Sequence, residues 1–358
     1  MTQYIPFSKR HCTCSSSRSC HSDPSPSLAA KARYSNPKLS TPAPDLPTPS
    51  TCLAHSSAAR LEIEKVAKLI LASKRCVVVS GAGISCSAGI PDFRSSSGLF
   101  STLKEQHGNH INQGRDLFDA QLFNSETTTR IFHQFIGQFK QSIENVQPTP
   151  THQFLSWLHS QGRLTRWYTQ NIDGLEAKTG LSPPTHLHPS YPCTPSRISR
   201  DHKSTVVPLH GDLDQLVCPL CSTYYPFTPA FFSSYQQGEA PICPHCAKLN
   251  DNRLEAGRRP ISVGKLRPNI VLYNEPHPSG ELIAKVMNTD VRLKPDLLLI
   301  LGTRLNVHGC KALVKAMART VRQQKHGKII MVNLDPIQSK EWDDLIDIQV
   351  LGPADDLI

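Results

Sequence analysis

The sequence predicts an α/β fold with a parallel sheet, and two patterns carry that prediction. The apolar run Cys76–Val79 leads directly into the glycine turn Ser80–Ile84, after which we expect a helix. Strand, glycine turn and helix in this order open nucleotide-binding α/β folds. Similar apolar runs return along the chain and end each time at polar or glycine residues. We therefore predict a Rossmann-like parallel sheet as the large lobe of the molecule.

Five later runs are expected to be strands of this kind. They are Leu164–Thr169, Val206–Leu209, Asn269–Tyr273, Leu297–Leu301 and Ile329–Val332. Open parallel sheets bind ligands beyond the carboxyl ends of their strands. The residues that follow these runs therefore form the expected site.

The remaining segments predict helices and a small lobe. Apolar residues at helical spacing predict a helix over Leu61–Ser73, and the pattern between Phe100 and Trp157 is mostly helical. We expect a small lobe that joins this helical module, near 100–160, to a four-cysteine module near 214–260. The segment between Cys218 and Cys246 has the pattern of loops, and residues 182–205 that of a surface insertion.

Composition sets the domain boundaries. Residues 1–57 are rich in Ser and Pro and poor in large apolar side chains, so we expect a disordered tail, followed by one folded domain over 58–358. No apolar run reaches the roughly 18 residues of a membrane span, and no apolar segment near the start indicates a secretory signal. The basic, Ser-rich start also fits a mitochondrial transit peptide, although its prolines oppose the required helix.

Cysteine spacing predicts a metal site. Cys218 and Cys221 form one Cys-x-x-Cys pair, and Cys243 and Cys246 form a second, with 21 residues between the pairs. This spacing is typical of a tetrahedral zinc site with four cysteine ligands, in which no position stays open for catalysis. A catalytic metal and redox-active disulfides are the alternatives. We interpret His245, inside the second pair, as a bystander.

The glycine turn departs from the dehydrogenase pattern. Gly81, Ala82 and Gly83 would let the backbone approach a pyrophosphate at a helix N-terminus. Cys86 stands where the third glycine of G-x-G-x-x-G belongs, and no convincing acidic residue follows about 20 residues later. Taken alone, the turn predicts either a phosphate-binding loop or merely a tight turn.

The longer segment Gly81–Arg94 resembles the signature of the sirtuins, the NAD-dependent protein deacylases. Further motifs follow in the order of that family: Thr169–Leu175, Leu209–Gly211, the two cysteine pairs, Gly302–Thr303 and Asn333. The resemblance covers the chain from about residue 60 to its end. The segment Gly302–Lys311 is most similar to the fungal nuclear branch that acts on histone H3.

The resemblance implies roles for individual residues. His210 would be the catalytic base, and Asn171 would join it at the catalytic centre. The side chains or backbone that would bind NAD are those of Gly81, Ala82, Gly83, Ile90, Asp92, Phe93, Arg94, Gln170, Asn171, Ile172, Asp173, Gly302, Thr303, Asn333 and Ala354. Those that would line the acyl-lysine channel are Ile270, Val271 and Tyr273. Without the resemblance, His210 is a polar residue at a strand end, the segment after Gln170 is a turn, and Ile270–Tyr273 is a core strand.

The resemblance also implies a function. It predicts an NAD-dependent protein-lysine deacetylase that consumes NAD, carries one structural Zn²⁺, acts on acetylated histone H3 in the nucleus and gives nicotinamide and O-acetyl-ADP-ribose. A mono-ADP-ribosyltransferase, a deacylase for longer or acidic acyl groups and a non-catalytic chromatin-binding relative are the alternatives.

Three features depart from the family pattern. Arg304 stands where a serine is common, and Asn274 replaces a common glycine in the segment expected to pair with the substrate peptide. The chain stops at Asp355–Ile358, where members of the family continue into a closing helix, so the sequence is compatible with a fragment. Arg304 would either supply charge to the cofactor or crowd its pocket.

A basic stripe follows the Gly302–Thr303 motif. It consists of Lys311, Lys315, Arg319 and Arg322, which share one face of an expected helix. Such a stripe is either solvated or directed at DNA or an acidic partner, and the net charge of +10 is compatible with both.

Overall fold

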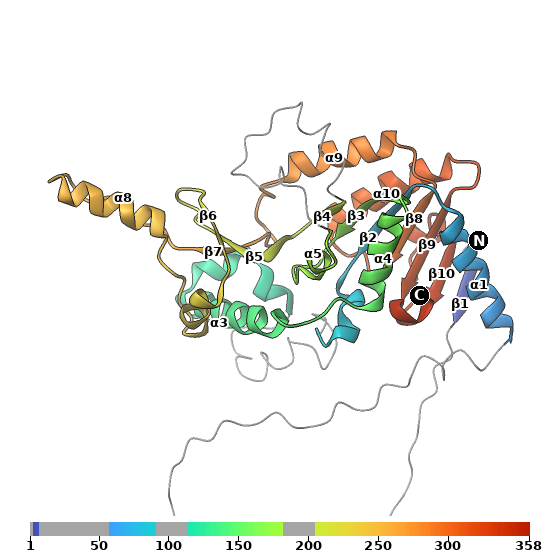
Figure 1. Ribbon diagram of the computed structural model, residues 1–358, viewed down its shortest axis with the longest axis horizontal. Coiled ribbons are helices and arrows are strands. Elements are labelled where there is room, and N and C mark those ends of the chain that lie inside the picture. The colour runs from blue at the N-terminus through green and yellow to red at the C-terminus, as the bar shows by residue number, and fades with distance from the viewer. Residues whose placement is uncertain (1–2, 7–56, 91–113, 182–204) are drawn as a thin grey trace, which may run out of the picture.

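The computed structural model describes residues 3–6, 57–90, 114–181 and 205–358. Within these residues the large lobe is a sheet of seven parallel strands in the order β1-β10-β9-β8-β2-β3-β4 (Figure 1). The strands are β1 (Gln3–Pro6), β2 (Cys76–Ser80), β3 (Leu164–Thr169), β4 (Val206–Pro208), β8 (Leu297–Leu301), β9 (Lys328–Asn333) and β10 (Ile348–Leu351). Because Ser80 is in register with Thr169 and Leu301, the carboxyl ends of the three central strands meet at one edge.

The predicted strands of the large lobe are confirmed, with three differences. The run Asn269–Tyr273 does not join this sheet, because its strand, β7 (Arg267–Ile270), is antiparallel and belongs to the small lobe. Strand β10 was not predicted. Strand β1 pairs with β10 inside the segment expected to be a disordered tail, and α1 begins at Ser57. The expected tail is therefore wrong at these positions, and residues 7–56 lie outside the described part.

Helices cover both faces of the sheet. α1 (Ser57–Ala72) and α4 (Pro150–Ser160) pack on one face with η8 (Ala354–Leu357), whereas α9 (Gly280–Arg292), α10 (His308–Arg322) and α11 (Lys340–Asp343) pack on the other. Every residue of β2 and of β8 is buried. Strands covered on both faces read as continuous apolar runs, which explains why these strands could be found from the sequence.

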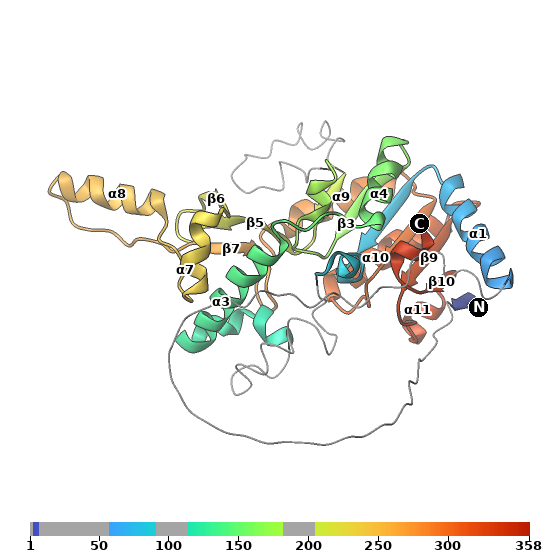
Figure 2. The same cartoon turned by 60° about the horizontal axis from the view of Figure 1, so that its bottom comes forward.

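The small lobe joins helices to an antiparallel sheet. Its three strands, in the order β6-β5-β7, are β5 (Gly211–Val217), β6 (Tyr224–Pro226) and β7. The helices are η4 (Gly114–Phe118), η5 (Ala120–Asn124), α3 (Glu126–Ile143), η7 (Pro229–Phe231), α7 (Phe232–Gln236) and α8 (Pro244–Glu255). The segment between the cysteine pairs therefore contains a strand and short helices, where loops were expected. Figure 2 shows α3 and α7 side by side.

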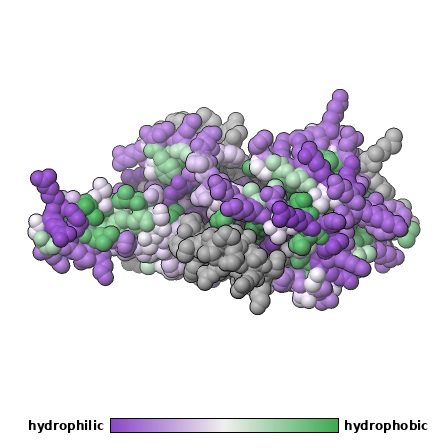
Figure 3. Space-filling view, turned by 90° about the horizontal axis from the view of Figure 1, so that it is seen from above, coloured by the Kyte–Doolittle hydropathy of each residue, from purple (hydrophilic) through white to green (hydrophobic). Residues whose placement is uncertain are grey.

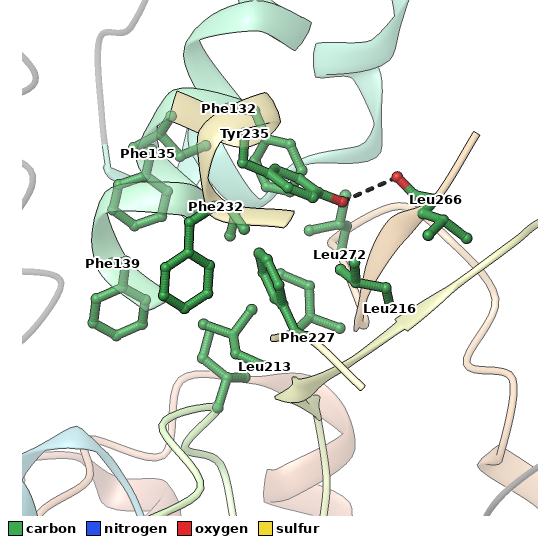
Figure 4. Close-up of a cluster of buried hydrophobic side chains, with 14 of the residues drawn as sticks. Phe132, Phe135, Phe139, Leu213, Leu216, Phe227, Phe232, Tyr235, Leu266 and Leu272 are labelled. Carbon is green, nitrogen blue, oxygen red and sulfur yellow. Dashed lines mark hydrogen bonds between the residues drawn. The ribbon is translucent and has the colours of Figure 1, made fainter. Parts of the chain in front are cut away.

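Aromatic side chains fill the small-lobe core (Figure 4). Phe135 stacks on Phe139 within α3, and Phe227 packs against Tyr235 of α7. The Tyr235 hydroxyl donates to the Leu266 carbonyl at 3.0 Å, so the one polar group of this ring is satisfied inside the core. Truncation of a buried Phe to Ala typically destabilises a protein by about 3–5 kcal/mol. The burial of these rings therefore holds α3 and α7 on the β-strands.

The segment after β3 ties the two lobes together. Ile172 and Leu175 belong to the small-lobe core, although they follow a strand of the large lobe. α5 (Leu175–Lys178) adds a polar link, because the Lys178 ammonium donates to the carbonyls of Ile143, Glu144 and Val146 at the C-terminus of α3. A cation at this end of a helix satisfies carbonyls that lack helical partners. The turn after β3, which holds several of the residues predicted to bind the cofactor, is thus fixed by contacts with both lobes.

α8 projects at the far end of the small lobe (Figure 1). On α8 and the two cysteine segments before it, four aliphatic side chains are exposed: Leu220, Ile242, Leu249 and Leu254. Figure 3 shows hydrophobic residues at the same end, within an otherwise mostly hydrophilic face. Among the described helices, none combines the length and the apolar character that crossing a bilayer requires.

Candidate active site and cysteine cluster

The glycine turn is packed against the loop after β8. Gly83 N–H donates to the Gly302 carbonyl at 3.0 Å, and Gly81 N–H donates to the Leu301 carbonyl at 3.0 Å. A Cβ on Gly83 would lie 2.7 Å from the Gly302 Cα, and one on Gly81 would lie 2.8 Å from the Thr303 Cβ. These glycines are therefore required by the contact between two backbone segments, a reason additional to the predicted approach of a pyrophosphate.

The helix expected after this turn is absent from the described residues. Two single 3₁₀ turns, η2 (Ala82–Ile84) and η3 (Cys86–Ala88), stand in its place and end at Gly89, whose φ is +82°. Glycine and serine residues in and around this segment are poor helix formers, which explains the difference. Backbone N–H groups still lie at the edge of the sheet, but between Gly81 and Ile90 they belong to these short turns and not to a long helix.

Gln170 and Asn171 come together with the glycine turn. The Gln170 amide donates to Thr303 Oγ1 at 2.8 Å and to the Ser80 carbonyl at 3.2 Å, so it joins the ends of three strands. The Asn171 amide is buried and donates to Ser85 Oγ at 3.1 Å. The structure thus brings two predicted site residues from β3 against residues that follow β2 and β8.

Asp173 lies in the same buried turn. Its carboxylate accepts a hydrogen bond from Ser85 Oγ at 2.8 Å and another from the Leu175 N–H at 3.1 Å. Burial raises the pKa of Asp173, and these two hydrogen bonds oppose that rise. The neighbouring Ile172 side chain packs in the small-lobe core, and its carbonyl accepts from the Leu213 N–H. Ser85 was missed by the sequence analysis, although it lies inside the quoted motif.

His210 stands at the junction of the lobes, between β4 and β5. Its Nδ1 lies 2.9 Å from the Gln170 carbonyl, which only accepts, so Nδ1–H donates and Nε2 of the neutral ring carries a lone pair. Burial lowers the pKa of His210, which favours this neutral form. The next residue, Gly211, has φ +75° and lies so close to Asn269 that a Cβ would contact its carbonyl oxygen at 2.1 Å.

The predicted channel residues connect to His210 through the backbone. The Val271 N–H donates to the His210 carbonyl at 2.9 Å. Ile270 is buried in the small-lobe core, whereas Val271 and Tyr273 are half-buried and alternate with the buried Leu272. Because side chains alternate along extended backbone, Val271 and Tyr273 are better placed than Ile270 to face a channel.

The segment after Tyr273 already has one partner. Tyr273 N–H donates to the Phe118 carbonyl at 2.6 Å, and Ala120 N–H donates to the Tyr273 carbonyl at 2.9 Å. Asn274 has φ +63°, and its amide donates to the Asp119 carboxylate at 2.6 Å. Asn tolerates this left-handed conformation better than most residues other than glycine. The replacement of a common glycine by Asn274 is thus explained.

Arg304 points to a carboxylate beside the loop after β9. Its guanidinium donates to Asp335 Oδ2 at 2.8 Å, and 57% of its side chain is exposed. The Asn333 amide donates to the Asp335 carbonyl at 3.0 Å, which orders the same loop. Ala354 is buried in the core on the α1 and α4 face of the sheet. An arginine that is exposed and paired does not crowd the buried end of the site.

The structure describes the predicted cofactor loop only as far as Ile90. Ile90 is buried against the small-lobe core. Asp92, Phe93 and Arg94 lie outside the described residues. Their roles stay predictions.

The four predicted metal ligands form one cluster. Cys218, Cys221, Cys243 and Cys246 each offer an Sγ within 4.8 Å of the others, and none of them is in a disulfide. The Sγ atoms of Cys221 and Cys243 are 3.6 Å apart, and those of Cys218 and Cys246 are 3.8 Å apart. Four thiolates at about 2.3 Å from a central tetrahedral Zn²⁺ lie about 3.8 Å from one another. The donor set and its spacing therefore fit zinc.

Two neighbours of the cluster show how it is enclosed. A Cβ on Gly264 would lie 2.5 Å from Cys218 Sγ, so only glycine leaves room for the thiol. His245 is exposed and is not part of the cluster; its N–H donates to the Tyr225 hydroxyl. Its side chain also hydrogen-bonds Cys221, and the interpretation of His245 as a bystander stays a prediction.

The basic stripe on α10 is partly neutralised. Lys311 and Lys315 both bind Glu341 of α11, at 3.2 and 2.7 Å, and Lys315 also lies over the Trp342 ring. Arg319 and Arg322 are exposed. Half of the stripe therefore serves contacts within the large lobe.

The model of the Sir2 family matches residues 81–202 and 197–309, which hold the glycine turn, Gln170–Asp173, His210 and the cysteine cluster. The chain belongs to the Sir2 family. The resemblance to the sirtuins inferred from the motifs is thereby confirmed.

Named relatives agree with this assignment. The NAD-dependent histone deacetylase HST3 of Saccharomyces cerevisiae is 40% identical over 301 residues, which cover 83% of this chain and 66% of that protein. The NAD-dependent protein deacetylase hst4 of Schizosaccharomyces pombe is 39% identical over 83% of this chain and 68% of its own length. The hst4 protein of Emericella nidulans is 39% identical, and the match covers 46% of it. The chain thus spans about half to two thirds of the length of these relatives.

Solved structures share the fold. A Sir2 protein with a p53 peptide and NAD⁺ matches with a TM-score of 0.56 at 22% identity, over 81% of this chain and 93% of that one. Another Sir2 enzyme matches with a TM-score of 0.57 at 25% identity, over 83% and 95%. The two-lobed α/β architecture of this sirtuin is therefore that of the family.

Proposed function

We propose that this sirtuin is an NAD-dependent protein-lysine deacetylase that acts on histones. The observation that carries the proposal is the position of His210 between the lobes, with Nδ1–H donated to the Gln170 carbonyl and Nε2 left as a base. Gln170 in turn belongs to the turn that holds Asn171 and Asp173. A base, a buried amide and a buried carboxylate are thus connected through one short segment.

His210 would accept a proton through Nε2 from a hydroxyl of the nicotinamide ribose during the reaction. NAD would supply an electrophilic ribose carbon for the acetyl oxygen, with nicotinamide as the leaving group. A general base is most effective when it is unprotonated at the working pH and fixed in orientation. The lowered pKa of His210 and its hydrogen bond to Gln170 meet both requirements.

The turn after β3 would hold the nicotinamide end of the cofactor. Asp173 and the Ile172 backbone would bind the carboxamide, and Asn171 and Gln170 would bind the nicotinamide ribose. Ser85 joins this set, because it connects the side chains of Asn171 and Asp173. Gly81, Gly83, Gly302, Thr303 and Asn333 line the ends of β2, β8 and β9, where an α/β sheet binds the rest of a dinucleotide.

The cysteine cluster would hold a structural Zn²⁺. Four thiolates complete a tetrahedral coordination shell, so the metal would stabilise the small lobe and take no part in the chemistry. Tyr225 and Gly264 close the cluster.

The substrate would be an acetyl-lysine side chain of a histone, with histone H3 as the specific expectation. Relatives at 37–40% identity are named histone or protein deacetylases. Val271 and Tyr273 would enclose the neutral acyl-lysine, whose burial costs far less than that of a charged lysine. A nuclear location and a role in chromatin silencing follow from the same substrate. A contact with DNA would rest on Arg319 and Arg322, since Lys311 and Lys315 are paired.

One assay tests the deacetylase function. The full chain is incubated with NAD and an acetylated histone H3 peptide, and nicotinamide, O-acetyl-ADP-ribose and the loss of acetyl mass are measured. We expect all three from the wild type and none from His210→Ala. The control His308→Ala changes an exposed histidine at the start of α10 and should behave as wild type.

Other outcomes identify the alternatives. ADP-ribose attached to protein, without loss of acetyl mass, would indicate a mono-ADP-ribosyltransferase. Release of a longer or acidic acyl group in preference to acetyl would indicate another deacylase. Tight NAD binding with no product would indicate a non-catalytic relative.

A further inference from the structure

A second group of potential metal ligands joins α4 of the large lobe to the turn after β3 and to α5. It consists of His152 of α4, Asp173 and Glu176 of α5, whose exposed fractions are 0%, 5% and 3%. One ligand atom from each lies within 4.8 Å of the other two. Within the described residues, His152 Nε2 and Glu176 Oε1 are buried and have no hydrogen-bond partner. Buried polar atoms left without partners are rare, and a bound ion is one of the explanations for them.

The hydrogen bonds of His152 fix its tautomer. The Thr149 hydroxyl donates its proton to the Ile84 carbonyl at 2.9 Å, so its oxygen accepts from His152 Nδ1–H at 2.7 Å. Nε2 is then an unprotonated, buried nitrogen, and it is the ring atom left for a metal. Histidine ligands of metals characteristically donate their second ring N–H to an oxygen in this way, which fixes the ring.

Burial outweighs the favourable contacts of the two carboxyl groups, although Lys178 lowers the pKa of Asp173 and a hydrogen bond from Thr169 lowers that of Glu176. Burial and the neighbouring Asp173 raise the pKa of Glu176 to about 8, and burial also raises the pKa of Asp173. Burial lowers the pKa of His152 to about 4, so its ring stays neutral near pH 7. A dication among these groups would stabilise both carboxylates and use the free nitrogen lone pair.

We propose that His152 Nε2, Glu176 and Asp173 form a second metal site, separate from the cysteine cluster, for a divalent transition metal such as Zn²⁺. One imidazole and two carboxylates suit such an ion, whereas Mg²⁺ and Ca²⁺ prefer oxygen ligands alone. Ligand bonds of about 2.1 Å place neighbouring ligand atoms about 3.4 Å apart in a tetrahedron. Because the ligand atoms now lie within 4.8 Å of one another, they would approach by at most about 1.4 Å when a metal binds.

Occupation of this site would inhibit the enzyme, and this consequence rests on the proposed function. Asp173 would bind the nicotinamide carboxamide of NAD, and the same carboxylate would be drawn toward the metal. Ser85 and the Leu175 N–H hold both of its oxygens, so its freedom to serve the two ligands at once is small. Zn²⁺ and NAD would therefore compete.

Zinc binding is measured by calorimetric titration of the full chain after the cysteine cluster has been loaded with Zn²⁺. Glu176→Gln and His152→Gln should each bind one equivalent fewer than the wild type. The controls Glu255→Gln and His308→Gln change exposed residues and should bind as many as the wild type. Equal uptake by the wild type and either folded site variant would overturn the proposal.

A spectroscopic measurement on the wild type alone covers the case in which the variants do not fold. Co²⁺ added as the next equivalent should show weak ligand-field absorption without a thiolate-to-cobalt charge-transfer band. That band would place the ion on cysteines and overturn the proposal.

Direct binding of NAD then tests the competition: Zn²⁺ should raise the apparent Kd of the wild type for NAD at least tenfold and leave that of Glu176→Gln unchanged. Both binding readouts are independent of deacetylase activity, so failure of the proposed function would leave the metal site intact.

Discussion

Ser85 donates a hydrogen bond to the Asp173 carboxylate at 2.8 Å, across 88 positions of sequence, while its oxygen accepts one from Asn171. The serine comes from the 3₁₀ segment after β2, and the aspartate comes from the turn after β3. These two hydrogen bonds fix the position of the segment after the glycine turn relative to the residues proposed to bind nicotinamide. It also lowers the pKa of a carboxyl group that burial raises.

Ser85→Ala should therefore weaken NAD binding. Loss of a hydrogen bond to a charged, buried group costs about 1.5–3 kcal/mol, so we expect the KM for NAD to rise at least tenfold. The kinetics are measured with NAD as the varied substrate, beside Ser233→Ala, an exposed serine of α7. An unchanged KM for Ser85→Ala would remove Ser85 from the proposed site.

The pH dependence of the reaction should report His210. Because burial lowers its pKa, the ring stays neutral below its ordinary value of about 6.5. The acid limb of kcat/KM, which reports groups of the free enzyme, should therefore have an apparent pKa below 6.5. A limb centred above 6.5 would contradict the assignment, and His308→Gln should keep the wild-type profile.

The same lowered pKa makes a prediction about stability. Below about pH 6.5 the unfolded chain binds a proton at this histidine more readily than the folded chain does. His210 therefore contributes a loss of stability as the pH falls through that range. Urea unfolding at pH 7.5 and 5.5 should show a smaller loss for His210→Gln than for the wild type.

Much of this site could be predicted from the sequence, because its residues sit in contiguous motifs at strand ends. His210, Gln170 and Asp173 all lie where those motifs place them. Ser85 was missed because its role depends on a partner that folding brings near. His152 and Glu176 were missed for the same reason, since 24 positions of sequence separate them and only folding brings them together.

The errors in the fold have physical causes. Residues 270–273 form a short, continuous apolar run, which predicts a buried strand without showing whether it pairs in a parallel sheet or, like β7, in an antiparallel one. Strand β10 was missed because Gln349 interrupts a run of only four residues, and its side chain is satisfied by the backbone of Ile337. The glycine turn predicted a helix that Gly83 and Gly89 do not favour.

Arg304→Ser tests whether the departure from the family pattern matters. The Arg304–Asp335 pair is largely exposed, and exposed pairs contribute about 0–1 kcal/mol. We expect the melting temperature to change little and deacetylation to persist, with the KM for NAD altered less than threefold. A loss of activity would instead make the arginine a cofactor ligand. Asp335→Asn, which breaks the same pair from the other side, is the matched variant.

Cys218→Ala should release zinc and unfold the small lobe. Cys218 is fully buried among the other three thiols, and three ligands bind the metal much less tightly than four. Zinc retained after dialysis is measured together with thermal unfolding. Cys310→Ala is the control, because this cysteine is also buried but belongs to α10 and packs in the large-lobe core. Full activity in a zinc-free Cys218→Ala protein would show that the assignment as a structural site is wrong.

The buried ion pair between β3 and α9 makes the strongest stability prediction. Arg166 binds Asp290 through Nε at 2.9 Å and through a second nitrogen at 3.0 Å, and the Tyr168 hydroxyl donates to the same carboxylate at 2.6 Å. Asp290→Ala leaves the arginine buried without its partner, which costs about 3–5 kcal/mol. Tyr168→Phe removes one hydrogen bond and should cost about 1–2 kcal/mol.

Urea unfolding of the two single variants and of the double variant measures the coupling between Tyr168 and Asp290. Because Asp290 is the shared acceptor, the double variant should be less unstable than the sum of the single effects. Additive effects would mean that Tyr168 and Asp290 stabilise the strand independently.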